Sequence, residues 1–187
     1  RGMDSSGPHE RASSRQRLSP AWIAAGVIAI VVLSLLAYAL VSGPTAPPQL
    51  GSPVPDFQLT ALDGSTMDLA SHRGDVVVVN FFASWCAPCR QEAGDLEQVW
   101  REMGGRGVQF YGIAYKDAAS KAQAFLDEFG VSYPSAVEPG NQAARAYGVT
   151  GVPETFIVDA DGNLVRHFVG PVNRAELVRE LTPLMSP

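Results

Sequence analysis

The sequence predicts an α/β domain in which strands and helices build a three-layer sandwich. Two observations indicate this class. A strongly apolar run at residues 76–82 leads into a helical pattern and then into a second apolar run at residues 108–114, which indicates a βαβ unit. After a further helix, residues 155–184 hold a hairpin and a closing helix. We expect the domain to cover residues 56–187, with an additional hairpin at its start.

An apolar segment precedes this domain. Residues 21–41 carry no charged side chain, and a segment of that length can cross a bilayer as one helix. Arginines lie before it, in residues 1–20, and no Lys or Arg follows until Arg73. The positive-inside rule therefore predicts a cytoplasmic tail, a transmembrane anchor and a domain outside the cytoplasm. A cleaved signal peptide is the alternative, because residues 37–39 (Ala-Tyr-Ala) have the spacing of a cleavage site.

Residues 42–55 form the expected linker between anchor and domain. The linker is rich in proline, and such chains are stiff and extended at roughly 3 Å per residue. The whole chain has a net charge of −5 and contains neither a basic stripe nor a phosphate-binding glycine motif. These features exclude nucleic acids and nucleotides as expected partners.

Turn and capping signals set the expected bounds of the elements within the domain. The opening hairpin turns at Asp63-Gly64, and the closing hairpin turns at residues 159–162. Gly104 and Gly130 are expected to end two helices. Three residues are expected to begin helices: Asp117 as a cap, Asn141, and Asn173 with Glu176 three residues later.

The only two cysteines of the chain, Cys86 and Cys89, lie three residues apart at the expected strand-to-helix junction. This spacing puts both sulfur atoms on one face of the first helical turn, where they can form a disulfide. The helix N-terminus favours an anion, so we expect Cys86 to have a lowered pKa and to be the nucleophile, and Cys89 to resolve the mixed disulfide. A structural disulfide would close too short a loop to stabilise the fold much. A zinc site, the other alternative, usually needs four ligands, and the sequence has no second cysteine pair.

These residues resemble the thioredoxin fold family. Trp85 directly precedes the Cys-x-x-Cys pair, and a Gly-Val-Thr-Gly-Val-Pro segment follows at residues 148–153. The resemblance implies that Pro153 is cis and faces the cysteines, and that the Val152 backbone pairs with an extended substrate segment. We expect Trp85 either to cover Cys86 or to lie in the core.

Further motifs resemble the membrane-anchored TlpA/ResA group and, within it, the DsbE/CcmG proteins of cytochrome c maturation. These motifs are Val-Pro-Asp-Phe at 54–57, Cys-Arg-Gln-Glu at 89–92, Tyr-Lys-Asp at 115–117 and Gly-Val-Pro-Glu-Thr-Phe at 151–156. The resemblance implies a membrane-anchored protein-disulfide reductase that acts outside the cytoplasm and needs no cofactor. Its implied substrates are the haem-attachment cysteines of apocytochrome c or other exported disulfide proteins, and its implied electron donor is a membrane thiol-disulfide carrier.

Two positions depart from the thioredoxin pattern. Asn80 replaces a buried aspartate on the strand, and Gly94 replaces a proline that kinks the helix. Because Asn80 cannot titrate, we expect Glu92 to exchange protons with Cys89 and to have a pKa raised by partial burial. The alternative is a solvated glutamate in the first helical turn. We expect Glu154 to shape the substrate groove, or else to be an exposed strand residue.

The sequence also bears on competing functions. No histidine lies between the cysteines, so we expect a reductant rather than a strong oxidant. Residues 55–57 (Pro-Asp-Phe) also occur in peroxiredoxins, but the Pro-x-x-x-Thr-x-x-Cys signature of those enzymes is absent. His72 and His167 match no metal spacing, so we expect no metal site. A general disulfide reductase and a tethered haem or copper carrier that uses the cysteines as ligands stay open as alternatives.

Overall fold

The computed structural model describes the backbone of residues 20–41 and 46–185. The chain separates into two units, residues 1–44 and 45–187, and each is described by itself. Apart from Pro20, the predicted tail at residues 1–20 lies outside the described residues.

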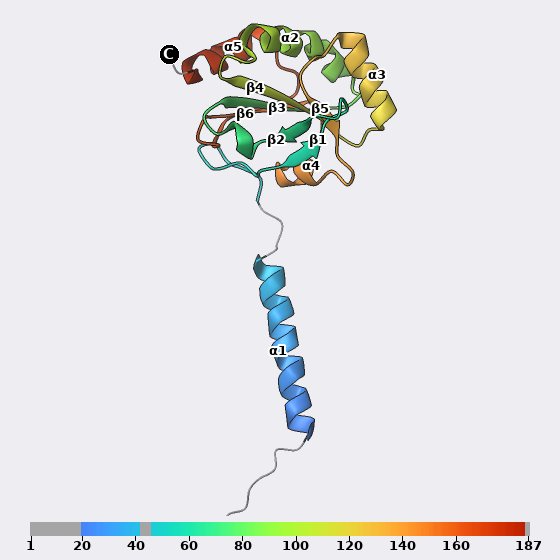
Figure 1. The fold of residues 1–187 in the computed structure, drawn as a ribbon, viewed down its shortest axis with the longest axis vertical. Coiled ribbons are helices and arrows are strands. Elements are labelled where there is room, and N and C mark those ends of the chain that lie inside the picture. Colours follow the sequence, from blue (N-terminus) through green and yellow to red (C-terminus); the bar gives the residue numbers. More distant parts are fainter. Residues whose placement is uncertain (1–19, 42–45, 186–187) are drawn as a thin grey trace, which may run out of the picture. The chain divides into compact units, whose positions relative to one another are not determined.

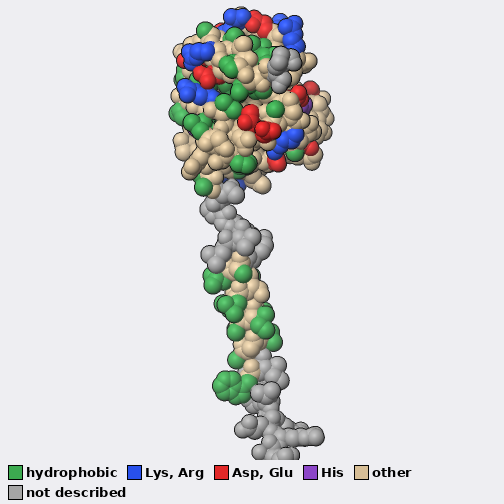
Figure 2. Space-filling view, turned by 90° about the vertical axis from the view of Figure 1, so that its left-hand side faces the viewer, with side chains coloured by type: hydrophobic (Ala, Val, Ile, Leu, Met, Phe, Trp, Pro, Cys, Tyr) green, Lys and Arg blue, Asp and Glu red, His purple; other side chains and the backbone are tan. Residues whose placement is uncertain are grey.

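The first unit contains one helix, α1 (Pro20–Val41), among its described residues. The large hydrophobic side chains described in α1 are exposed, and many of them are visible in the face drawn in Figure 2. Within the described part of the chain, no helix is long and apolar enough to cross a membrane. The anchor at residues 21–41 stays a prediction from the sequence.

The second unit is built on a five-stranded sheet with the strand order β5-β4-β3-β6-β7. Strands β5, β4 and β3 are parallel to one another, whereas β6 pairs antiparallel with both β3 and β7. The strands of the sheet are β3 (Val76–Phe82), β4 (Val108–Ala114), β5 (Ser135–Val137), β6 (Glu154–Val158) and β7 (Leu164–Val169). A separate antiparallel hairpin pairs β1 (Gln58–Thr60) with β2 (Thr66–Asp68). The helices are α2 (Ala87–Met103), α3 (Ala119–Phe129), α4 (Gln142–Ala146) and α5 (Arg174–Leu181), with short 3₁₀ turns at Ala70–His72 and Thr182–Leu184.

Helices α2, α3 and α5 cover one face of the sheet, and the β1–β2 hairpin with α4 covers the other (Figure 1). The alternation of side chains along β3 decides which core each residue joins. Val77, Val79 and Phe81 pack with the hairpin and α4, whereas Val76 and Val78 pack with α2 and α5. All of β3 is buried, as expected for a central strand covered on both faces. The fold is therefore the predicted three-layer α/β sandwich with an N-terminal hairpin.

Most of the predicted bounds are confirmed. Helix α2 ends at Gly104, and α3 ends at Gly130, whose left-handed φ of 63° suits glycine. Helix α5 begins with the expected capping box, in which Asn173 accepts from the backbone of Glu176 and the Glu176 side chain accepts in return. Helix α2 continues as one α-helix through Gly94, so the missing proline leaves no break in it.

Two features of the fold differ from the prediction. Strand β5 was not predicted, because three residues are too few to show a period of two. Asp117 does not cap α3, which begins after Ala118 without a side-chain cap. The carboxylate of Asp117 is occupied elsewhere, in the loop before Cys86.

The predicted linker at residues 42–55 is not free over its whole length. The Gly51 amide donates to Leu164 O at 2.8 Å, and the Leu164 amide donates to Ser52 O at 2.9 Å. Pro53 and Asn163 form an antiparallel bridge. The chain from Gly51 onward therefore belongs to the folded domain, and Pro47 already lies close to Gly148 of that domain.

Candidate active site

The two cysteines lie at the N-terminus of α2 and form a disulfide in this structure, with their Cα atoms 5.3 Å apart. Cys86 is the N-cap residue, and its Sγ accepts a hydrogen bond from the Cys89 amide at 3.1 Å. The first amides of a helix lack partners within the helix, so they stabilise negative charge on a sulfur placed there. Both cysteines are buried in this oxidised structure, but Cys86 keeps 3% of its surface exposed and Cys89 keeps none, so Cys86 is the more accessible of the two. This arrangement supports Cys86 as the attacking thiol.

The loop before β6 lies against the Cys86 sulfur. The Val152–Pro153 peptide bond is cis, as the resemblance implied, and Val152 O lies 3.4 Å from Cys86 Sγ. A cavity of about 240 Å³ opens beside this contact. Pro88, residues 150–154 and residues 169–171 line the cavity, and we call it the Pro153 groove. The structure thus brings the predicted Val152, Pro153 and Glu154 together at one groove next to the cysteines.

Glu92 is buried and is not the solvated first-turn glutamate of the alternative. Its Oε1 accepts from Asn80 Nδ2 at 2.8 Å, and its Oε2 accepts from the Val172 amide at 2.9 Å. Burial raises the pKa of Glu92 to about 7, although both hydrogen bonds act to lower it. Glu92 and Cys89 are three residues apart on the buried face of α2, so their side chains are neighbours. A carboxyl group with this pKa can accept and return a proton near neutral pH.

Glu154 is also buried, which excludes the exposed strand residue of the alternative. Its Oε1 accepts from the amides of Thr150 at 3.1 Å and Gly151 at 3.3 Å. Its Oε2 lies 2.7 Å from Nε2 of His167, on the neighbouring strand β7. This partner was not predicted from the sequence. Alternation along β7 gives the face on which His167 lies, but only the register of β7 with β6 brings it to Glu154.

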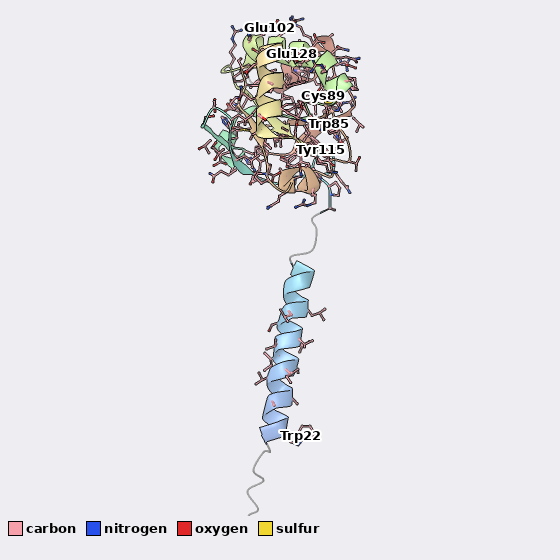
Figure 3. The ribbon with its side chains drawn as sticks, turned by 90° about the vertical axis from the view of Figure 1, so that its right-hand side faces the viewer. Trp22, Trp85, Cys89, Glu102, Tyr115 and Glu128 are labelled. Carbon is pink, nitrogen blue, oxygen red and sulfur yellow. A yellow bond between two sulfur atoms is a disulfide. The ribbon has the colours of Figure 1, made fainter. Side chains whose placement is uncertain are left out.

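Trp85 is 60% exposed, so it is not a core residue. Its indole Nε1 donates to the carbonyl of Lys116 at 3.4 Å. Figure 3 shows Trp85 between Cys89 and Tyr115, on one side of the domain. An exposed aromatic side chain held at this place can form part of a surface that meets a protein substrate.

Asp117 fixes the loop that leads into Cys86, a role that the sequence analysis missed. Its Oδ2 accepts from the Ser84 amide at 2.6 Å, and its Oδ1 accepts from Ser84 Oγ at 3.0 Å and from the Ala118 amide at 2.8 Å. The carboxylate therefore ties the end of β3 to the loop after β4. Among the described residues, no group of three or more His, Cys, Asp or Glu side chains could hold a metal ion.

Comparison with known proteins assigns the family. The model of the AhpC/TSA family matches residues 50–167. The thiol:disulfide interchange protein HelX of Rhodobacter capsulatus is 38% identical over 114 residues, which are 60% of this chain and 62% of HelX, slightly under two thirds of that relative. The thiol:disulfide interchange protein DsbE of Allochromatium vinosum is 36% identical over 164 residues, 85% of this chain and 89% of DsbE.

A solved structure agrees with this assignment. The thiol:disulfide interchange protein of the thioredoxin family from Chlorobium tepidum superimposes with a TM-score of 0.67 at 32% identity. The match covers 76% of this chain and 99% of the Chlorobium chain. The chain therefore belongs to the AhpC/TSA family, with the thioredoxin-like fold of its relatives, and is a thiol-disulfide oxidoreductase with Cys86 and Cys89 as its redox pair.

Proposed function

We propose that the protein reduces disulfides outside the cytoplasm, and that its substrate is the pair of haem-attachment cysteines in apocytochrome c. The observation that carries the proposal is the Pro153 groove, which opens beside the reactive Cys86 and offers the Val152 backbone at its edge. An extended, unfolded segment can lie in such a groove and pair with this backbone. Apocytochrome c presents its cysteines on a chain that has not yet folded around haem, so it suits a groove of this kind.

The reaction proceeds in two exchange steps. The Cys86 thiolate attacks one sulfur of the substrate disulfide, the substrate S–S bond breaks, and the other substrate sulfur leaves as a thiolate that takes up a proton. Cys89 then passes its proton to the Glu92 carboxylate and attacks Cys86 Sγ. This step forms the Cys86–Cys89 disulfide seen here and releases the second substrate sulfur as a thiolate, which takes up the proton from Glu92 or from water. Two electrons pass to the substrate, and a membrane dithiol carrier must return two electrons to the protein.

Location is part of the proposal. We infer an N-terminal anchor at residues 21–41 with the catalytic domain outside the cytoplasm, on the basis of the uncharged segment and the arginines before it. Alkaline phosphatase fused after residue 187 is expected to be active, and the full chain is expected to stay in the membrane under alkaline carbonate. An inactive fusion would contradict the orientation, and release by carbonate would favour a cleaved signal peptide.

Substrate choice is tested with two oxidised peptides of equal length, one containing Cys-x-x-Cys-His and the other Cys-x-x-Cys-Ala. Full-length reduced protein is expected to reduce the histidine peptide about tenfold faster in single turnover, because a site that hydrogen-bonds a substrate group discriminates against the analogue that lacks this group. Equal rates would overturn the apocytochrome assignment and favour a general reductase of exported proteins. Tight binding of haem or copper by the reduced domain, without disulfide turnover, would favour a carrier.

A further inference from the structure

We propose that His167 is a positioning residue for thiol-disulfide exchange, and that it acts through Glu154 to hold the backbone of the Pro153 groove. This inference rests on the proposed use of that groove by an extended substrate. His167 does not line the groove. Its effect must therefore pass through a group that does.

The register of the sheet places the two side chains together. Glu154 is paired with Val169, and Phe156 is paired with His167, across β6 and β7. Residues two apart in a strand share a face, so Glu154 and His167 are diagonal neighbours on one face. The imidazole stacks on Phe156, with ring centroids 4.1 Å apart and planes 13° from parallel. Stacking fixes the plane of the ring, and Nε2 then lies 2.7 Å from Glu154 Oε2.

Glu154 transmits this contact to the groove. Its side chain is 4% exposed, so water cannot replace a lost partner at low cost. While Oε2 is held by His167, Oε1 accepts from the amides of Thr150 and Gly151. The residue that follows β7 holds the loop at a second point, because the Gly170 amide donates to Pro153 O at 2.9 Å.

The loop segment that Glu154 holds lies next to the reacting sulfur. Thr150 and Gly151 lead directly into Val152, whose carbonyl lies 3.4 Å from Cys86 Sγ. If the His167 contact is removed, the Glu154 carboxylate has to turn or move to find another donor. That movement releases the two amides and loosens the edge on which an extended substrate lies. Binding of a polypeptide disulfide is then weakened, whereas a small disulfide that needs only Cys86 is unaffected.

The test uses full-length protein and three variants. His167→Phe keeps a ring against Phe156 and removes the donor, and His167→Gln removes the ring and keeps an N–H near the position of Nε2. His72→Phe is the matched control, because His72 also lies 3.1 Å from a carboxylate, Asp75, and packs edge-on against Tyr111, away from the groove. Single-turnover reduction is measured with a Cys-x-x-Cys peptide that lacks the following histidine, and with hydroxyethyl disulfide.

We expect His167→Phe to raise the half-saturating peptide concentration roughly tenfold, with the saturating rate and the hydroxyethyl disulfide rate within about twofold of wild type. We expect His167→Gln and His72→Phe to match wild type within about twofold on both substrates. Equal peptide reduction by wild type and His167→Phe would overturn the inference, and so would an equal loss on both substrates or a His167→Gln variant as impaired as His167→Phe. This peptide lacks the haem-motif histidine, so its reduction does not depend on whether apocytochrome c is the substrate. The His167 variants can therefore be interpreted even if the apocytochrome proposal fails. If the wild-type protein reduces the peptide no faster than hydroxyethyl disulfide, the groove does not bind an extended substrate, and this inference fails with that proposal.

Discussion

The side-chain amide of Asn80 donates to Oε1 of Glu92 at 2.8 Å, between the central strand β3 and the active-site helix α2. Asn80 Nδ2 also lies 2.9 Å from Thr155 Oγ1, so the amide is held from β6 as well. Where thioredoxin-like sequences place a titratable aspartate on this strand, this protein has a neutral amide that orients a glutamate on the helix. We therefore predict that Glu92 is the group that exchanges protons with Cys89.

The first prediction concerns the rate of the second exchange step. In Glu92→Gln the shape is kept and the titratable group is lost, so resolution of the mixed disulfide is expected to slow by about 100-fold, the low end for acid–base assistance. The attack by Cys86 on a small disulfide is expected to change by less than about twofold, because the N-terminus of α2 is intact. The two steps are separated by rapid-quench single turnover with an oxidised peptide between pH 5 and 9.

Glu97→Gln is the control for this prediction. Glu97 is a second buried glutamate on α2, but it binds the Ser132 amide at 2.7 Å and Arg101 Nε at 2.6 Å, away from the cysteines. Its variant is expected to keep the wild-type resolution rate. A Glu92→Gln protein with the wild-type rate and pH profile of resolution would show that Glu92 takes no part in proton exchange.

The second prediction concerns stability against pH. The pKa of Glu92 rises from 4.5 to about 7 in the folded state, because burial disfavours the carboxylate. The folded protein therefore binds a proton that the unfolded chain has lost between these two values, so this contribution to stability is full below pH 4.5 and disappears as the pH rises through 7. The Glu92 proton thus contributes roughly 3 kcal/mol to the free energy of unfolding at low pH, at about 1.4 kcal/mol per pKa unit. Glu92→Gln has no titrating group at this position and lacks this pH-dependent contribution.

Urea denaturation of the oxidised wild type and Glu92→Gln, at steps from pH 4.5 to 8, measures this effect. Relative to wild type, the variant is expected to gain roughly 2–3 kcal/mol in the free energy of unfolding across that range. A difference that stays constant with pH would mean that Glu92 titrates normally in the folded protein.

The third prediction assigns the two sulfurs. Because Cys86 lies at the N-cap of α2 and is the more accessible sulfur, Cys89→Ser is expected to accumulate covalent adducts with substrate proteins, and Cys86→Ser is expected to accumulate none. Adducts are detected as bands on non-reducing gels that disappear with reductant. Equal trapping by both variants would contradict the assignment of Cys86 as the attacking thiol.

The fourth prediction concerns the loop before Cys86. Asp117→Ala removes the acceptor for the Ser84 amide and hydroxyl, so it is expected to destabilise the fold by about 1–3 kcal/mol and to slow attack by Cys86. Asp63→Ala is the matched control, because Asp63 Oδ1 accepts from the Ser65 amide at 2.8 Å and from Ser65 Oγ at 2.7 Å in the β1–β2 turn.

Stopped-flow reduction of a small disulfide, corrected for the folded fraction, separates the two effects of Asp117→Ala. We expect Asp63→Ala to lose stability without losing rate. If both variants keep the wild-type rate once folded, the Asp117 contacts hold the fold but do not place Cys86.

The sequence was sufficient for those parts of the site that depend on position along the chain. The Cys-x-x-Cys spacing placed Cys86 and Cys89 at the start of α2, and the step of three residues placed Glu92 beside them. The bounds of β3 and β4 followed from apolar runs long enough to show their character.

The parts that the sequence did not reveal depend on contacts between distant segments. Asp117 has the residue type and the position of a helix cap. Only the folded chain brings Ser84 close enough to compete for its carboxylate. Glu154 looks like an exposed strand residue until the register of β6 with β7 brings His167 across to it. Pairings of this kind are fixed by tertiary structure, and a single sequence contains no local period that reports them.

The attachment of residues 51–53 to the start of β7 has a mechanical consequence. These hydrogen bonds are, among the described residues, the first that link the N-terminal side of the domain to a segment far along the chain. A pulling force applied from the N-terminal side would load this pairing at Leu164 before it loaded β6 or β3. We therefore expect such tension to be carried first by the edge strand β7, and not directly by the cysteine pair on α2.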